Sequence, residues 1–309
     1  MDIKEYQLRA RVTDQNPEIS WPKDGPAKEP VKHNVIPLLG LVGEVGGLLS
    51  EYKKMLRDGA LHEEFPQQVA EELGDILWYV ATVATKFGLD LDQIAKDNIK
   101  KTEDRWHEPG KRRALYDEKL SPEQQLPRTF SYTFSHKEVK GEQRLVITDN
   151  ERKEDLGAAL KDNAYEDDGY RYHDIMHLSF ATHLGWSPVW RKLLRDRKVG
   201  IPLAKRTPSS VDDAEDGGRP QVIEEGLVHA AYVYADQHNF MDGVNAVDWQ
   251  LLRHIKEMTT KLEVKDRSGW EWNKALIDGF KIWRKLRENN GGTVTGDLIA
   301  GTLTFAPTK

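Results

Sequence analysis

Two stretches of sequence decide the fold of the first third of the chain, LLGLVGEVGGLLSEYKKML at residues 38–56 and VAEELGDILWYVATVATKF at residues 69–87. Apolar residues recur in both at intervals of three and four, which predicts two amphipathic helices. A glycine, Gly59 or Gly88, follows each run and marks its end. Both stretches also carry carboxylates on faces where a packed helix should be apolar. Burying several like charges is unfavourable unless a cation neutralises them, so the pattern indicates a cation site.

The candidate metal ligands are Glu44, Glu51, Glu72 and Asp75. The first two fall on one face of the first predicted helix, and the last two, three residues apart, share a face of the second. Mg²⁺ prefers oxygen ligands and completes its shell with waters and substrate phosphate. Such an ion polarises a phosphoryl oxygen and lowers the pKa of bound water. We therefore expect Mg²⁺, or Mn²⁺ in its place, with Glu44, Glu72 and Asp75 as catalytic residues.

A third predicted helix, residues 91–106, carries a polar stripe made of Asn98, Lys101 and Arg105. Lysine and arginine suit phosphate charge, and an asparagine amide suits a ribose, base or phosphate oxygen. We expect this stripe to bind and orient the substrate phosphates. The alternative is that these charged faces are simply solvated, which is the simpler interpretation for any one residue but not for the whole set.

The composition excludes several classes of protein. With 38% hydrophobic residues in 309, the chain can form packed cores and is not a disordered protein. A net charge of −6 leaves no basic excess, so no nucleic-acid partner is expected. The lack of cysteine excludes disulfides and thiolate metal sites. No run has the roughly 18 apolar residues of a membrane span, and residues 1–14 lack an apolar signal core, so we expect a cytoplasmic protein.

The sequence predicts a helical domain at residues 1–110, a charged, proline-containing linker at 111–127 and an α+β domain at 128–309. In the last of these, alternation of polar and apolar residues around a Lys-Gly-Glu tripeptide predicts a β-hairpin over 129–148. Residues 195–220 are basic, then acidic and glycine-rich, and predict a long surface loop. Helical patterns occupy residues 170–184, 222–237, 247–262 and 270–288.

A second candidate site lies in the C-terminal part. His173 and His177 have the i, i+4 spacing of metal ligands on a helix. Glu224, Glu225 and His229 belong to another predicted helix, on which Glu225 and His229 repeat the i, i+4 spacing. One interpretation is a metal site between the helices, formed by these histidines and carboxylates, with His173, His177 and Glu225 as the candidate ligands. The alternative is that the two histidines make ordinary hydrogen bonds to the acidic run at residues 166–168.

Three motifs resemble the MazG-type all-α nucleoside triphosphate pyrophosphohydrolases in order and spacing: GLVGEVGGLLSEYKK (40–54), VAEELGDILWYV (69–80) and DNIKKTEDRW (97–106). The resemblance covers about residues 1–110, and the rest of the chain resembles the C-terminal extension of some MazG-like proteins. It implies Mg²⁺ bound by an E-x-x-E and an E-x-x-D pair, and cleavage of a nucleoside triphosphate into a monophosphate and pyrophosphate. The matching residues are Glu44, Glu72, Asp75, Asn98 and Lys101.

The sequence departs from this family pattern at one position. The second glutamate of the E-x-x-E pair falls on Gly47. Glu51, one turn further along the same face, could replace the missing ligand. Alternatively, the protein is a nucleotide-binding regulator or sensor with a weakened site. A third alternative centres the chemistry on His173, His177 and Glu225.

The expected fold is mainly α, with a MazG-like helical domain followed by an α+β domain that has a β-hairpin and several helices. Three short helices cannot bury apolar faces of this size by themselves. We therefore expect the N-terminal domain to form a helix bundle by oligomerisation, as a homodimer or a higher homo-oligomer. The expected substrates are nucleoside triphosphates.

Overall fold

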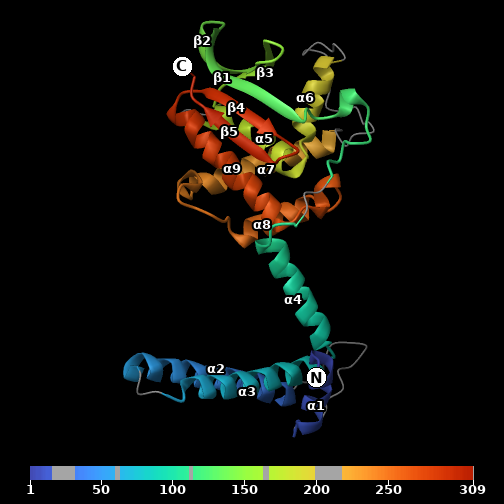
Figure 1. Cartoon of the computed structure of the whole chain (residues 1–309), viewed down its shortest axis with the longest axis vertical. Helices are drawn as coiled ribbons and strands as arrows, with labels where there is room; N and C mark the ends of the chain where they lie inside the picture. The colour runs from blue at the N-terminus through green and yellow to red at the C-terminus, as the bar shows by residue number, and fades with distance from the viewer. Residues whose placement is uncertain (16–31, 60–62, 111–113, 163–166, 199–217, 309) are drawn as a thin grey trace. The chain divides into compact units, whose positions relative to one another are not determined.

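The structure is a computed structural model that describes residues 1–15, 32–59, 63–110, 114–162, 167–198 and 218–308. The chain forms two compact units, residues 1–103 and residues 104–309 (Figure 1). The described part of the first unit is helical, and the second combines helices with an antiparallel sheet. The predicted class, mainly α with an α+β C-terminal region, is therefore confirmed.

The first unit is built around a long helix pair. α3 packs against both α2 and α1. The apolar core that the described residues form here is small and consists of Ala10, Ala81, Ala84 and Leu91. The predicted helices are confirmed, although α2 and α3 each begin several residues earlier than expected. The helices are α1 (Ile3–Thr13), α2 (Lys32–Asp58), α3 (Phe65–Lys86) and α4 (Leu91–Trp106), whose last residues belong to the second unit.

Glycines on α2 allow side chains of α3 to lie directly against its backbone. A Cβ atom placed on Gly40 would come within 2.2 Å of the Tyr79 ring, and one placed on Gly47 within 2.4 Å of the Glu72 carboxylate. The two glycines are seven residues apart, as are their two partners, and the order is reversed on α3. Seven residues are about two helical turns, so α2 and α3 run antiparallel with one continuous close contact. This contact fixes which residues of the two helices face each other.

The second unit contains a five-stranded antiparallel sheet in the order β3-β2-β1-β4-β5 within the described residues. The predicted hairpin is confirmed as β1 and β2, with Lys140 and Gly141 both at positive φ in its turn, as tight hairpin turns require. The other three strands were not predicted. The strands are β1 (Thr129–Val139), β2 (Glu142–Asp149), β3 (Glu154–Leu160), β4 (Gly292–Asp297) and β5 (Thr302–Ala306).

Helices α5 and α9 pack against each other and against β4 and β5, and thereby cover one face of the sheet (Figure 1). Every residue of α5 from Ile175 to Leu184 is buried, so this helix is enclosed on all sides. α7 packs against α5 and α6, which places its side chains beside those of α5. The helices of this unit are α5 (Asp174–Leu184), α6 (Pro188–Lys198), α7 (Gly218–Asp236), α8 (Trp249–Met258) and α9 (Gly269–Glu288).

Two segments that the sequence predicted as a loop and a linker contain more structure than expected. The loop predicted for residues 195–220 is wrong at both ends, because residues 195–198 finish α6 and residues 218–220 begin α7, while residues 199–217 lie outside the described part. In the segment predicted as a linker, Leu115 and Leu126 join the core of the second unit. The buried Asp117 accepts hydrogen bonds from the Leu126 amide and from Arg128.

In the part of the chain that the structure describes, no helix is long and apolar enough to cross a membrane.

The close contact at Gly40 gives a stability prediction for the first unit. Gly40→Ala should destabilise the α2–α3 pair by about 1–3 kcal/mol, because the new methyl group overlaps the Tyr79 ring. Gly43→Ala, on the same helix with no atom within 4 Å of the added Cβ, should stabilise the helix by about 0.5–1 kcal/mol. Hydrogen exchange of the α2 and α3 amides measures both effects locally. Equal protection in the two variants would contradict the packing described here.

Candidate functional site

The acidic residues predicted as metal ligands lie on the two packed helices of the first unit. Glu44 and Glu51 belong to α2, and Glu72 and Asp75 belong to α3. Glu51 is buried, Glu44 and Glu72 are partly buried, and Asp75 is exposed. Glu51 forms an ion pair with Lys54 one turn along the same helix. The acids therefore share one helix–helix interface, but they differ in their access to solvent.

The carboxylate of Glu72 lies against the backbone of α2 at Gly47. A Cβ atom on Gly47 would come within 2.4 Å of Glu72 Oε2 and 2.6 Å of Oε1. Any side chain at position 47 would therefore displace this carboxylate. Position 47 is where the sequence lacks the glutamate of the family pattern. In the structure, the Glu72 carboxylate fills the space that a side chain at position 47 would take.

The surroundings of Glu72 disfavour its charged form unless a cation is present. Burial raises the pKa of Glu72, and the charges of Glu44, Asp75, Glu51 and Glu71 raise it further. Its Oε2 atom is buried and has no hydrogen-bond partner. Burying a carboxylate oxygen that has no hydrogen bond costs free energy. A proton or a metal ion at Oε2 would remove both penalties, so the side chains present here suit a cation.

The acids do not form a closed ligand shell by themselves. Within the described residues, no three carboxylates of α2 and α3 bring oxygens within 4.8 Å of one another. Mg²⁺ commonly takes only one or two carboxylates from a protein and fills its shell with waters and substrate phosphates. This arrangement therefore fits an ion that is completed by its substrate better than a permanent structural ion.

The polar stripe of α4 divides between the two units. Asn98 and Lys101 are exposed residues of the first unit, and within the described residues neither makes a hydrogen bond or ion pair. Arg105 belongs to the second unit, where its guanidinium lies 4.5 Å from the ring centroid of Trp106 and 5.2 Å from that of Trp249. Arg105 is therefore held against aromatic rings of the second unit.

The second predicted cluster is brought together in the C-terminal unit. One nitrogen of His173, one nitrogen of His177 and one oxygen of Glu225 all lie within 4.8 Å of one another. Burial opposes charging of His177, but Glu224 and Glu225 outweigh it and raise its pKa well above the ordinary value. The alternative was that these histidines form hydrogen bonds with the acidic run 166–168. In the structure, the hydrogen-bond partner of His177 Nδ1 is Glu224, and that of His173 Nδ1 is the Tyr170 carbonyl, so the described residues of the run are not their partners.

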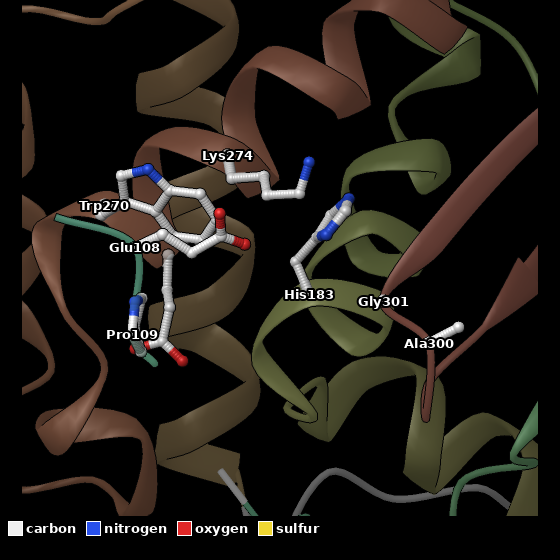
Figure 2. Close-up of a pocket in the computed structure, with 8 residues that line it drawn as sticks. Glu108, Pro109, His183, Trp270, Lys274, Ala300 and Gly301 are labelled. Atoms are coloured by element: carbon white, nitrogen blue, oxygen red, sulfur yellow. The ribbon is translucent and has the colours of Figure 1, made fainter. Parts of the chain in front are cut away.

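Sequence reasoning missed two features. The first is that Glu224, which it placed beside Glu225 on one helix, is fully buried and holds the Nδ1 atom of His177. The second is a cavity of about 150 Å³ in the C-terminal unit, lined by His183, Trp270 and Lys274 among others. Figure 2 shows Lys274 and His183 close together, facing Trp270 and Glu108.

One carboxylate beside this cavity is tightly held. Asp278 is paired with His183 at 3.2 Å and with Lys274 at 3.0 Å. Burial raises the pKa of Asp278, but the contacts with His183 and Lys274 prevail and lower it to about 2. The charges of Asp278, His183 and Lys274 are therefore paired with one another.

Comparison with known families agrees with both halves of the chain. The MazG nucleotide pyrophosphohydrolase domain matches residues 37–108. The MazG C-terminal domain matches residues 111–309, more than half of the chain. The protein therefore belongs to the MazG family, as the three N-terminal motifs and the C-terminal resemblance predicted. Residues 37–108 match the nucleotide pyrophosphohydrolase domain of that family.

The chain is also similar to a phage protein, the "Gene 37 protein" of Mycobacterium phage L5. The two are 38% identical over 69 residues, which is 22% of this chain and 60% of the phage protein. The match thus spans less than two thirds of that relative. No solved structure matches the chain.

The position of Glu72 predicts opposite behaviour for two neighbouring glycines. Gly47→Ala should weaken Mn²⁺ binding to the acidic face, because the methyl group displaces the Glu72 carboxylate. Gly46→Ala has no atom within 4 Å of the added Cβ and should bind Mn²⁺ like the parent protein. Titration calorimetry with Mn²⁺ compares the two variants. If Gly47→Ala binds Mn²⁺ unchanged, Glu72 is not a ligand in the position described.

Proposed function

We propose that the protein is a Mg²⁺-dependent nucleoside triphosphate pyrophosphohydrolase. It cleaves the anhydride between the α- and β-phosphates and releases a nucleoside monophosphate and pyrophosphate. The observation that carries this proposal is the Glu72 carboxylate, which lies against Gly47 with a buried, unpartnered oxygen among further acids. Membership of the MazG family supports it.

Glu44, Glu51, Glu72 and Asp75 would hold the metal ion. When bound, Mg²⁺ supplies charge neutralisation for the phosphates and a more acidic water. The pKa of Glu72 is raised while no cation is present, and a bound ion would lower it again, which supports a metal ion at this carboxylate. We assign Glu44, Glu72 and Asp75 to orient the attacking water beside the ion.

The residues of α4 would bind the substrate. Lys101 is exposed and has no anionic partner within the described residues, so its ammonium is available to a phosphate. Asn98 lies three residues before Lys101, on the same side of α4. We propose that these two residues orient the triphosphate. We further propose nucleoside triphosphates rather than nucleic acid as partners, and the cytoplasm as the compartment.

A specific observation favours a second function, a nucleotide-binding regulator that does not hydrolyse its ligand. Glu51 is already paired with Lys54, so the acid expected to replace the missing ligand at Gly47 is partly neutralised. A site with fewer free carboxylates holds Mg²⁺ less firmly. The products formed from a nucleotide distinguish this function from hydrolysis.

Incubation with a panel of nucleoside triphosphates and Mg²⁺ should release pyrophosphate and monophosphate, and EDTA should abolish the release. Asp75→Asn should lower the rate at least about a hundredfold, because a bound Lewis acid stabilises the transition state by several kcal/mol. The matched control is Asp97→Asn, an exposed acid on α4 that bonds only Gln93 within the described residues. Stepwise release of orthophosphate, or full activity in Asp75→Asn, would contradict the proposal. Metal-dependent nucleotide binding without any product would instead support the regulator.

We also propose that the first unit forms a homodimer or a higher homo-oligomer. Val42 and Leu49, seven residues apart on α2, are 69% and 63% exposed. Their neighbours on the same helix and on α3 are also exposed, and an apolar surface of this extent is unusual on a soluble monomer. The further exposed apolar residues of α2 and α3 are Ile36, Leu38, Leu39, Val45, Tyr52, Leu56, Leu73 and Leu77.

Light scattering should therefore give a mass that is a multiple of the 35.4 kDa chain. The double substitution Val42→Glu and Leu49→Glu should reduce it to the monomer mass, because the added charges cannot be buried in an interface. Val222→Glu, at a similarly exposed apolar position in α7, is the control and should leave the mass unchanged. A monomeric parent protein at micromolar concentration would exclude the oligomer.

A further inference from the structure

We propose that His173, His177 and Glu225 bind a divalent first-row transition metal ion such as Zn²⁺ in the C-terminal domain. This site is separate from the acidic face of α2 and α3 and does not depend on the function proposed for it. Its three ligand atoms lie within 4.8 Å of one another without an ion present.

Two local structures position the three residues. Gly169, at a φ of 79°, begins the 3₁₀ turn Tyr170–Tyr172 that leads into α5. His173 directly precedes α5 and His177 follows one turn later, which places both rings on one side of the helix. Glu225 comes from α7, which packs against α5. The site therefore joins two helices that other contacts already hold together.

Glu224 fixes the orientation of His177. Its Oε1 atom lies 2.8 Å from His177 Nδ1 and accepts a hydrogen bond from the Ser187 hydroxyl at 2.7 Å. Its Oε2 atom accepts from the Val189 amide at 2.8 Å. Because a carboxylate only accepts, the Nδ1 atom of His177 carries the proton of this contact. A carboxylate behind a histidine in this way is the usual second partner of a metal-binding imidazole.

The other nitrogen of His177 has no hydrogen bond. Nε2 is buried, and it is 3.5 Å from Glu225 Oε2. The side chain of His177 is completely buried, so water cannot easily satisfy this atom. A buried nitrogen without a hydrogen bond is unfavourable. A metal ion bound by both Nε2 and the Glu225 carboxylate would satisfy it.

His173 can offer its Nε2 atom as a second nitrogen ligand to the same metal ion. Its Nδ1 atom lies 2.8 Å from the Tyr170 carbonyl oxygen, which can only accept a hydrogen bond. Nδ1 therefore carries a proton, and in the neutral ring the lone pair is at Nε2. Tyr170 stacks on this ring with centroids 4.6 Å apart and restricts its rotation. Asp174 Oδ1 lies 3.5 Å from Nε2 and is the nearest further acid.

The ligand chemistry selects the kind of metal. Mg²⁺ prefers an oxygen shell, whereas two imidazoles and one carboxylate suit Zn²⁺ and the other first-row transition ions. Three protein ligands are the number found in catalytic zinc sites, which keep one position for water or a substrate. The Glu225 side chain is 48% exposed, so solvent reaches this side of the cluster. The site can therefore bind an exchangeable oxygen ligand in addition to the metal.

Equilibrium dialysis of the full chain against Zn²⁺, in an excess of Mg²⁺ that saturates oxygen-only sites, should give one Zn²⁺ per chain. His173→Gln and Glu225→Gln should each weaken this binding at least about a hundredfold, since even partners behind the ligands contribute 10–100-fold. Glu224→Gln should weaken it by that smaller factor. Co²⁺ in place of Zn²⁺ should give the visible absorption of a nitrogen-ligated ion, and this absorption should be lost in His173→Gln.

Two controls separate the site from other causes. His229→Gln changes a histidine one turn after Glu225 that is not among the three ligands, and it should bind Zn²⁺ like the parent protein. Glu72→Gln should also keep Zn²⁺ binding, whatever becomes of nucleotide hydrolysis. Circular dichroism verifies that each variant is folded. If the parent protein binds no Zn²⁺, or folded His173→Gln and Glu225→Gln bind it unchanged, the three side chains only interact through their charges and the proposal is wrong.

Discussion

The close packing of α3 on the glycine face of α2 is the constraint on which the candidate active site depends. Tyr79 lies against Gly40, and Glu72 lies against Gly47 two turns away. If α2 carried larger side chains in place of these glycines, they would hold the Glu72 carboxylate away from the α2 backbone. Here the glycines bring it into the interface, next to Glu44 and Glu51. The fold therefore places negative charge where it is poorly solvated, and a cation is the natural counterpart.

The metal sites that we propose in the two units differ in their chemistry. The first unit offers only carboxylate oxygens, incompletely gathered, which suits an ion that arrives with phosphate. The second offers two imidazoles and a carboxylate already gathered by α5 and α7, which suits an ion that stays with the protein. The buried Glu224 behind His177 gives this site a rigidity that the acidic face lacks. We infer that the two units contribute separate chemistry to one chain.

The sequence predicts the elements whose signal is local. The periodic apolar residues of α2 and α3 and the tight turn at Lys140-Gly141 identify the helix pair and the hairpin. Strands β4 and β5 escape prediction because they are short, and β4 is held by pairing with β1 far away in the sequence. The role of Gly47 also escapes prediction. The sequence shows only that a carboxylate is missing there, and only packing shows that the Glu72 carboxylate fills the space.

A crystal structure with Mn²⁺ and a non-hydrolysable nucleoside triphosphate analogue tests the central claim most directly. Anomalous scattering locates Mn²⁺ without reference to the protein ligands. The account predicts an anomalous peak at about 2.0–2.2 Å from a Glu72 oxygen, with the triphosphate bound to the same ion. A triphosphate and Mn²⁺ bound elsewhere, while the Glu72 carboxylate remains against Gly47 without a ligand, would contradict it.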